Sequence, residues 1–346
     1  MTPYFACYLI LIASLGLGLL FDKLRIAAIL AFAPMFLIIA LRGIVGTDSA
    51  VYIQSFDVIR YQGVLASSFE PGFTVLVEVL SWFFRDSFDI LILLGCVTAV
   101  IMLCAGLMLE RSPLLFMTIV LPYFLLDMSM NGMRYGLAFA IVALGAAALA
   151  RGWLKTFIAC SIIAASIQVS SVLLAASLWA LMEARIRTFL AVGLGLFVAI
   201  FIFGGYIGEK LSQNSDIYGI GGLSGIAPLV ATIVIIGSLA VSKEQVVANK
   251  FALASVLAMQ FASFIIARQY YAGLRLQGIF LFLLYLIIVV AHKKYVVDFA
   301  KIGKLSKFAL CMTLIILSVS RLKNFGDDTS GLSPFNPYYF YRDIIA

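Results

Sequence analysis

Residues 88–109 read FDILILLGCVTAVIMLCAGLML, an apolar run in which Asp89 is the single charged residue. A helix that rises about 1.5 Å per residue can cross the roughly 30 Å hydrocarbon core of a bilayer with such a run. Of the 346 residues, 64% are hydrophobic and 12% charged, and the mean hydropathy is +1.11. Soluble domains carry about 25% charged residues. The sequence therefore excludes a water-soluble protein and predicts an all-α, polytopic helical membrane protein, because barrel strands give short alternating segments.

The other apolar runs set the expected number of spans. Ten runs are long enough to cross, at 3–21, 26–41, 88–109, 113–127, 134–150, 188–206, 226–242, 251–267, 276–292 and 308–320. Two stretches are ambiguous, because 71–84 is short and carries Glu78, while 156–182 is interrupted by the polar segment 168–171. We expect about ten full spans plus short half-helices near residues 71–84 and 156–182, all within a single integral-membrane domain over 1–346.

The charge distribution predicts the topology, because basic residues in short loops prefer the cytoplasm. The pattern fits best if 71–84 returns to its own side and 156–182 forms a hairpin. Both ends of the chain are then outside, with outer loops 42–70 and 207–225 and an outer C-terminal tail 321–346. If each ambiguous stretch crossed once instead, Arg42 and Arg134 would lie on opposite faces. Membrane topology also explains the net charge of +7, and no basic stripe with interleaved aromatics indicates a nucleic acid partner.

Arginine dominates the basic residues of the expected outer face. The set is Arg42, Arg60, Arg85, Arg134, Arg268, Arg275, Arg321 and Arg342. A guanidinium binds phosphate or carboxylate through two parallel hydrogen bonds, so this face is equipped to hold an oxyanion. Arginines that snorkel at helix ends are the simpler explanation for part of the set.

The first outer loop, LRGIVGTDSAVY at 41–52, holds the most compact polar group. Arg42 follows directly on a span, glycines allow close backbone approach, and Asp48 adds a carboxylate. Thr47 or Asp48 is suited to cap a following helix. Glu70, directly before Pro71, is typical of a second helix start.

Two further segments combine arginine with aromatic residues and glycine. They are NGMRYG at 131–136 and RQYYAGLR at 268–275. If the second were helical, Arg268 and Arg275 would share a face with Tyr271 between them. Two guanidiniums on one stripe repel unless an anion lies before them, although paired arginines at a wet interface remain the alternative.

These segments resemble the EpsG-like branch of the Wzy-type polysaccharide repeat-unit polymerases. The similarity lies in the loop 42–52, the turn 70–73, the arginine of NGMRYGLA at 131–138 and the closing residues 337–340. This branch often carries a histidine where the sequence here reads QVSS at 168–171. A proton-transfer role does not pass to Gln168, whose side chain has no titrating group.

The resemblance implies a membrane glycosyltransferase at the outer face of the bacterial inner membrane. A glycan on undecaprenyl diphosphate would be transferred to a hydroxyl of the next lipid-linked repeat unit, which extends an O-antigen or exopolysaccharide. The expected partners are the undecaprenyl-diphosphate-linked oligosaccharide, the lipid bilayer and a chain-length regulator protein.

That chemistry matches the candidate residues. The leaving diphosphate needs fixed donors, for which Arg42, Arg134, Arg268 and Arg275 are available. The attacking hydroxyl needs a carboxylate, and Asp48 or Glu70 can supply it. Tyr52 and Tyr271 could stack on sugar rings. We expect no metal and no cofactor, since no acidic cluster marks a divalent site.

Two other functions share parts of this pattern. A transporter or flippase of lipid-linked oligosaccharide would place polar residues near the middle of several spans, yet 88–109, 134–150 and 276–292 carry almost none. A related outer-face glycan ligase would share the arginines, and the sequence does not separate it from a polymerase.

Overall fold

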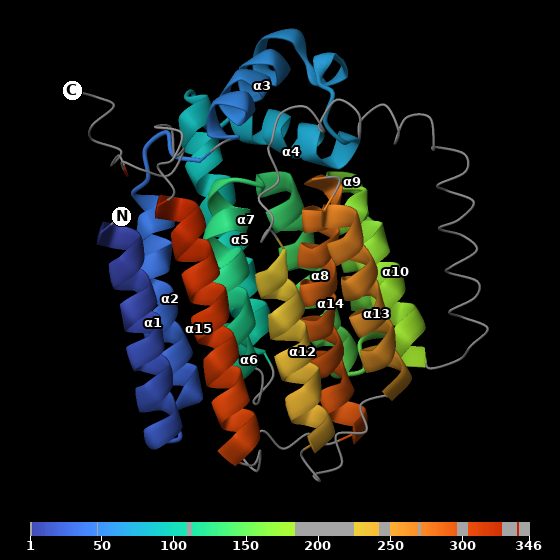
Figure 1. Ribbon diagram of the computed structural model, residues 1–346. Helices are drawn as coiled ribbons and strands as arrows, with labels where there is room; N and C mark the ends of the chain where they lie inside the picture. Colours follow the sequence, from blue (N-terminus) through green and yellow to red (C-terminus); the bar gives the residue numbers. More distant parts are fainter. Residues whose placement is uncertain are drawn as a thin grey trace. The chain divides into compact units, whose positions relative to one another are not determined.

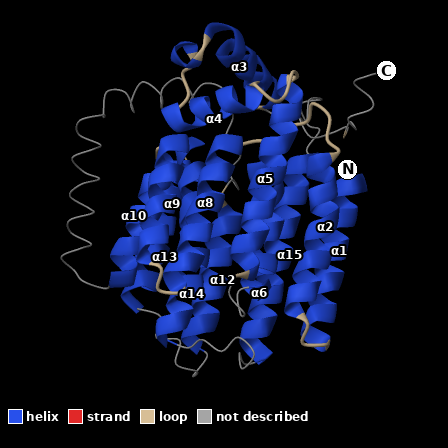
Figure 2. Cartoon of the chain, turned by 180° about the vertical axis from the view of Figure 1, so that it is seen from behind, coloured by secondary structure: helices blue, strands red, loops and turns tan. Residues whose placement is uncertain are grey.

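The computed structural model describes residues 2–46, 48–108, 113–183, 225–241, 250–268, 271–295, 304–326 and 338. Over these residues the chain forms helices and no strands (Figure 2). The predicted span at 188–206, nearly all of the loop 207–225 and most of the tail 321–346 lie outside them.

The chain divides into two compact units, which we describe separately. Unit 1 comprises Met1–Val172 and Ser318–Ala346, and unit 2 comprises Leu173–Leu317. The expectation of a single integral-membrane domain stays a prediction.

Long apolar helices define the protein class. Five helical segments of the described chain are long and apolar enough to cross a membrane: Pro3–Leu20, Ser87–Leu107, Pro113–Met130, Met133–Ala150 and Gly273–Val290. Shorter apolar helices lie at Leu24–Ala40, Pro71–Ser81, Leu154–Ile167, Ser170–Met182, Ile226–Leu239 and Phe251–Ala267. The chain is thus a helical membrane protein, as predicted, whereas the expected count of about ten full spans is not confirmed.

Unit 1 contains most of the described helices (Figure 1). They are α1 (Thr2–Leu20), α2 (Leu24–Ala40), α3 (Ser49–Gln62), η1 (Val64–Ala66), α4 (Pro71–Ser81), α5 (Ser87–Leu107), α6 (Pro113–Leu115), η2 (Phe116–Leu125), α7 (Leu126–Met130), α8 (Met133–Ala150) and α9 (Leu154–Ile167). Helix α1 packs on α2, and α8 packs on both α5 and α9. Helices α6 and α7 are joined through η2, a π-helical stretch that contains Pro122. Proline lacks the N–H that an α-helical turn would use, which favours such a widened turn.

Helices α3 and α4 lie across the end of unit 1 at which α5 begins and α9 ends (Figure 1). Glu70 and Pro71 begin α4 as the sequence predicted, with the proline in the first helical turn. The helix has 11 residues, which is too short to span a bilayer. That residues 71–84 return to their own side stays a prediction, and the structure places Arg42 and Arg134 at the same end of unit 1.

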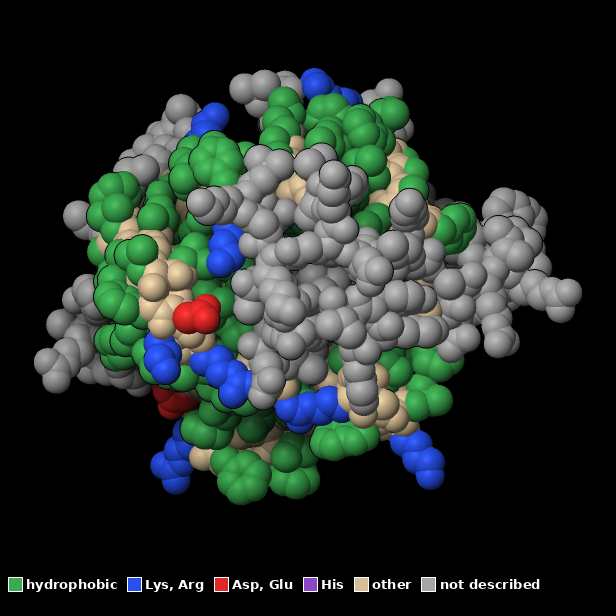
Figure 3. Space-filling view, turned by 90° about the horizontal axis from the view of Figure 1, so that it is seen from below, with side chains coloured by type: hydrophobic (Ala, Val, Ile, Leu, Met, Phe, Trp, Pro, Cys, Tyr) green, Lys and Arg blue, Asp and Glu red, His purple; other side chains and the backbone are tan. Residues whose placement is uncertain are grey.

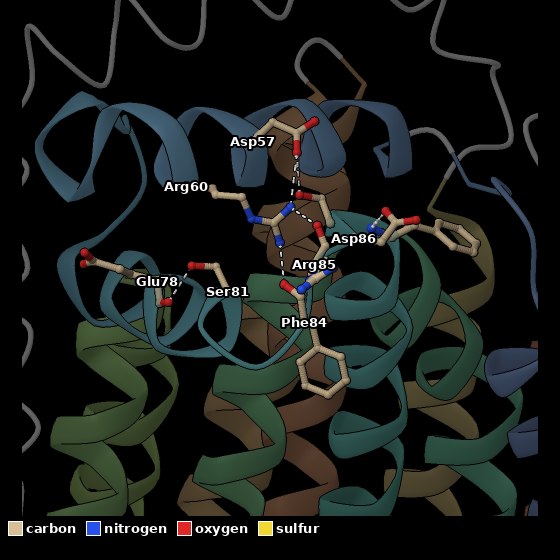
Figure 4. A network of polar contacts seen from close by, with 9 residues as sticks. Asp57, Arg60, Glu78, Ser81, Phe84, Arg85 and Asp86 are labelled. Carbon is tan, nitrogen blue, oxygen red and sulfur yellow. Dashed lines mark hydrogen bonds and ion pairs between the residues drawn. The ribbon is translucent and has the colours of Figure 1, made fainter.

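A polar network fixes α3 to the start of α5 (Figure 4). The Arg60 guanidinium donates to the carbonyl of Phe84 at 2.8 Å and also to that of Arg85. Ser87 donates to Asp57 at 2.6 Å. Asp86 accepts from the backbone N–H of Phe88 at 2.8 Å and so caps α5. The helices that cover this end are therefore held by side chains, not only by apolar contact.

The opposite end of unit 1 carries mainly basic residues. Lys23 and Arg25 follow α1, and Arg151 and Lys155 flank the turn from α8 to α9. Figure 3 looks at that end and shows Lys and Arg side chains among hydrophobic ones, with few acidic ones in view. In the predicted topology this end faces the cytoplasm, and the end with α3 and α4 faces outward.

Unit 2 contains most of α10 (Ser170–Glu183), together with α12 (Ile226–Val241), α13 (Lys250–Ala267), α14 (Tyr271–Tyr295) and the first part of α15 (Lys304–Gly326). The stretch 156–182 forms two helices, since α9 ends before Gln168 and α10 begins after Val169. The buried amide of Gln260 donates to Thr232 at 3.1 Å and to the carbonyl of Gln277 at 3.2 Å. These bonds tie α12, α13 and α14 together.

Candidate functional site at the α7–α8 turn

Arg42 follows α2 and is fully buried, with 0% of its surface exposed. Its Nη1 donates to the carbonyl of Met130 at 2.6 Å, and its Nη2 lies 3.6 Å from the sulfur of Met133. Nε has no hydrogen-bond partner, and no carboxylate of the described chain forms an ion pair with this guanidinium. Burial lowers the pKa of Arg42 to about 10, which leaves the group charged at neutral pH.

The α2–α3 loop, residues 41–48, wraps around the turn between α7 and α8. The Ser49 hydroxyl donates to the carbonyl of Val45 at 2.7 Å, and it also lies 3.4 Å from the carbonyl oxygen of Met130. The backbone N–H of Asp48 donates to the side-chain oxygen of Asn131 at 3.1 Å. Together with Arg42, these contacts hold the loop and the turn as one structure.

Two glycines explain why this loop and turn can pack so closely. Gly46 has a φ of +109°, which L side chains rarely adopt, and a Cβ there would lie 2.7 Å from the carbonyl oxygen of Met130. Gly136, in the first turn of α8, faces the carbonyl of Met128 so closely that a Cβ would collide with it. Close approach of backbone to α7 is thus the physical reason for these glycines.

Arg134, at the start of α8, pairs with Glu70 at the start of α4. The Nη1 and Oε2 atoms lie 2.5 Å apart, and the side chains are 25% and 18% exposed. The guanidinium also lies over the ring of Phe69, 4.1 Å from its centroid. Its Nε has no partner. The group is therefore held in place by one carboxylate and one aromatic face, with donor capacity left over.

Tyr52 lies between these elements and is 6% exposed. Its ring packs against Phe56, Phe69 and Phe73, with centroids 5.8 to 6.3 Å away. Its hydroxyl is 3.4 Å from the backbone nitrogen of Arg134, which donates to it. Burial raises the pKa of Tyr52, against an opposing effect of Arg134. The ring is covered by the protein, so the expected stacking on a sugar gains no support here, and the residue instead supports Arg134.

Asp48 precedes α3 as predicted, but its side chain makes no capping hydrogen bond. The residue is partly exposed, and its carboxylate acts electrostatically on Tyr52, the same phenol that Arg134 approaches. Asp48 therefore lies in the same group as Glu70 and Arg134. The carboxylate of Glu70 is fixed by its ion pair with Arg134.

The structure thus brings together five of the eight residues that the sequence selected: Arg42, Asp48, Tyr52, Glu70 and Arg134. Arg268 and Arg275 belong to unit 2 and are exposed, and the Arg268 guanidinium lies 4.7 Å from the ring centroid of Phe264. The side chain of Tyr271 lies outside the described residues.

The segment 268–275 does not form one continuous helix. Helix α13 ends at Ala267 and α14 begins at Tyr271, so the condition under which Arg268 and Arg275 would share a helical face is not met. Gly273 approaches the backbone of Ala267 too closely to allow a Cβ.

Sequence reasoning missed a second arginine and carboxylate pair in unit 1. Arg321 Nη2 lies 3.5 Å from Oδ2 of Asp127, and its guanidinium carbon lies 3.9 Å from the ring centroid of Tyr123. Asp127 lies near the C-terminal end of the helical stretch Pro113–Met130. An acidic residue within an apolar run is itself a signal for a functional site, and that signal was available from the sequence.

The predicted outer tail also reaches this end of unit 1. The hydroxyl of Tyr338 donates to the carbonyl of Ile38, near the end of α2, at 2.7 Å. Its ring meets that of Tyr4 edge to face, with centroids 5.8 Å apart. Tyr338 therefore lies at the same end of unit 1 as Arg42.

Helices long and apolar enough to span a bilayer define a helical membrane protein, and one end of unit 1 collects arginines and carboxylates. Across the described residues, no group of three or more His, Cys, Asp or Glu side chains could hold a metal ion. The family model of the EpsG family matches residues 25–340, so the chain belongs to the EpsG family. No curated protein and no solved structure matches the sequence.

Proposed function

We propose that the protein is a membrane glycosyltransferase that joins undecaprenyl-diphosphate-linked oligosaccharide repeat units into a surface polysaccharide at the outer face of the bacterial inner membrane. The EpsG family is associated with polysaccharide polymerase activity, which supports this class of reaction. The observation that carries the proposal is the partly exposed ion pair between Arg134 and Glu70. It lies beside Asp48, at the end of unit 1 that the charge distribution assigns to the outside.

The reaction breaks the bond between the anomeric carbon of the donor glycan and an oxygen of its diphosphate. The bonding electrons leave with that oxygen, so negative charge grows on the diphosphate. A hydroxyl oxygen of the acceptor repeat unit forms the new bond to the anomeric carbon, and its proton passes to a carboxylate. The products are a longer glycan on the acceptor lipid and free undecaprenyl diphosphate.

Arg134 is our candidate for the group that stabilises the leaving diphosphate. A guanidinium offers five N–H donors, and Glu70 engages one of its nitrogens, which leaves donors for a phosphate oxygen. Its placement over Phe69 fixes the plane of the guanidinium before substrate binds. Arg268, Arg275 and Tyr271 remain proposed contributors from unit 2.

Asp48 is our candidate for the proton acceptor, with Glu70 as the alternative. Glu70 is held by Arg134 at 2.5 Å, whereas Asp48 directly precedes α3, is partly exposed and lies in the same group of residues. Glu70 is accordingly suited to orient Arg134 and the incoming hydroxyl.

Arg42 has a different role in this proposal from the one its sequence position suggests. Its guanidinium is fully buried and donates to the carbonyl of Met130. It therefore acts as a positioning residue that holds the α7–α8 turn, from which Arg134 extends.

The test is to replace Arg134 by alanine, and separately Glu70 by glutamine, in cells that depend on this protein for a surface polysaccharide. Loss of one fixed donor to a developing anion typically lowers the rate about 10² to 10³-fold. We expect R134A to leave single repeat units on lipid in the outer leaflet and few long glycans. Arg85→Ala is the matched control, because that arginine lies at the same end with its side chain exposed, and it should polymerise normally.

Other outcomes would replace the proposal. Accumulation of lipid-linked units in the inner leaflet would indicate a flippase. Long glycans that are not attached to their final carrier would indicate a ligase. Normal long glycans in R134A would refute the role of Arg134.

A further inference from the structure

The pair formed by Arg321 and Asp127 is not used in the function proposed above. Both residues belong to unit 1, and their side chains are 15% and 30% exposed. They lie 194 positions apart in the sequence. The chain therefore brings a second guanidinium to the α7–α8 turn from a distant helix, α15.

The contact between the two groups is loose. The Nη2 and Oδ2 atoms are 3.5 Å apart, whereas charge-assisted N–H···O bonds are typically about 2.7 to 2.9 Å. The buried Nε of Arg321 has no partner. A purely structural ion pair in a membrane protein repays its desolvation only with short contacts that satisfy most donors. Arg321 instead retains unused donors beside a carboxylate that holds it weakly.

Aromatic residues fix the guanidinium in spite of this loose pairing. The guanidinium carbon of Arg321 lies 3.9 Å from the ring centroid of Tyr123. The phenols of Tyr8 and Tyr135 are close enough to act on this guanidinium electrostatically. Tyr8 is itself fixed, because its hydroxyl donates to the carbonyl of Pro122 at 2.7 Å. The positive charge is thus held in place by neutral rings, and an incoming anion would not have to displace a tight salt bridge.

The two arginine and carboxylate pairs flank the same turn. Asp127 belongs to α7, and its backbone carbonyl accepts from the N–H groups of Asn131 and Gly132 at 2.9 and 3.1 Å. Arg134, the second residue of α8, follows two residues after Gly132. Tyr135, which acts on Arg321, is the neighbour of Arg134 in the chain. One rigid turn therefore separates two sites of the same chemistry.

We propose that Arg321, which Asp127 pairs with in the absence of ligand, forms a second pyrophosphate-binding site that holds the diphosphate of the second lipid-linked saccharide while Arg134 holds the first. This inference rests on the proposed function, because a transfer between two lipid-linked saccharides brings two diphosphates to one end of the protein. Two separate guanidiniums meet that requirement, whereas one arginine between two dianions would leave one of them unbalanced.

The test measures binding of inorganic pyrophosphate to the purified full-length protein in detergent by titration calorimetry. The wild-type protein should bind two pyrophosphate ions. Arg321→Ala and Arg134→Ala should each bind one, and the double variant none. Arg85→Ala is the control and should bind two. Asp127→Asn removes the carboxylate that competes with the ligand, so it should tighten one of the two sites several-fold.

The possible results separate this inference from the proposed function. If R321A still binds two ions, or if D127N binds with unchanged affinity, the second site is refuted. The D127N measurement decides the matter where R321A does not fold. Two sites in a protein that fails to polymerise would refute the proposed function and leave this inference standing. Normal polymerisation with one site, abolished by R134A, would refute the inference alone.

Discussion

The α2–α3 loop and the start of α8 each carry an arginine at the same end of unit 1, yet the two side chains lie in opposite environments. Arg42 is fully buried and donates to a backbone carbonyl. Arg134 is 25% exposed and pairs with the carboxylate of Glu70. A partly exposed pair can release one partner to a ligand at small cost, whereas a buried guanidinium cannot exchange its contacts without opening the fold. The loop with the most distinctive sequence thus holds the structure together, and the less conspicuous turn presents the partly exposed guanidinium.

Replacing Arg42 by alanine should produce the largest change. The substitution leaves a cavity beside α7 and removes the donor from the Met130 carbonyl, which we expect to lower the free energy of unfolding by about 2 to 4 kcal/mol. Thermal unfolding in detergent can be followed with a fluorescent thiol probe, because Cys7 is a free, buried cysteine that unfolding would expose.

Arg134→Ala provides the contrast for that experiment. Exposed or partly exposed ion pairs contribute roughly 0 to 1 kcal/mol, so this variant should unfold close to the wild-type temperature while it loses activity. If Arg42→Ala melted like the wild type and still lost activity, Arg42 would belong to the binding site, and the comparison above would fail.

A pair of glycines tests how closely the α2–α3 loop must approach the turn. Gly46 and Gly63 both have positive φ values, +109° and +83°, and alanine at either position should cost about 1 kcal/mol in backbone strain. Only Gly46 faces a neighbour, since its Cβ would lie 2.7 Å from the Met130 oxygen while nothing lies within 4 Å at Gly63. We expect Gly46→Ala to destabilise by about 2 to 3 kcal/mol and Gly63→Ala by about 1 kcal/mol. Equal shifts in melting temperature for the two variants would show that the close approach of Gly46 to Met130 does not contribute to stability.

Much of the fold could be predicted from the sequence, because hydrocarbon length and helix-start signals act locally. Residues 88–109 became α5 at Ser87–Leu107, and Glu70 with Pro71 began α4. The placement of Arg42 and Arg134 on one face also followed, because positive charge in loops orients the spans. These expectations depend only on neighbouring residues in the sequence and on the thickness and charge of the membrane. They can be made without knowing which helices pack together.

The burial of Arg42 and the pair of Arg321 with Asp127 could not be derived in this way. Sequence shows that an arginine ends a span, but whether it faces water or a carbonyl depends on which helix packs beside it. Arg42 meets Met130 across 88 positions, and Arg321 meets Asp127 across 194. The spacing of Arg268 and Arg275 gave no reliable guide either, because α13 ends at Ala267 and a new helix, α14, begins at Tyr271.

Tyr52→Phe should change stability and activity the least. It tests whether Tyr52 only supports Arg134 or also contacts the substrate. The hydroxyl is 3.4 Å from the Arg134 nitrogen, a long hydrogen bond, and burial raises the pKa of Tyr52 above its ordinary value of 10.0, so the phenol stays neutral at physiological pH. The ring contacts with Phe56, Phe69 and Phe73 are unchanged in the variant. We therefore expect a loss of stability below about 1 kcal/mol and an activity within a few-fold of the wild type. A hundredfold fall in polymerisation, with unchanged melting temperature, would instead place the hydroxyl on the substrate and move Tyr52 from the supporting residues to those that bind.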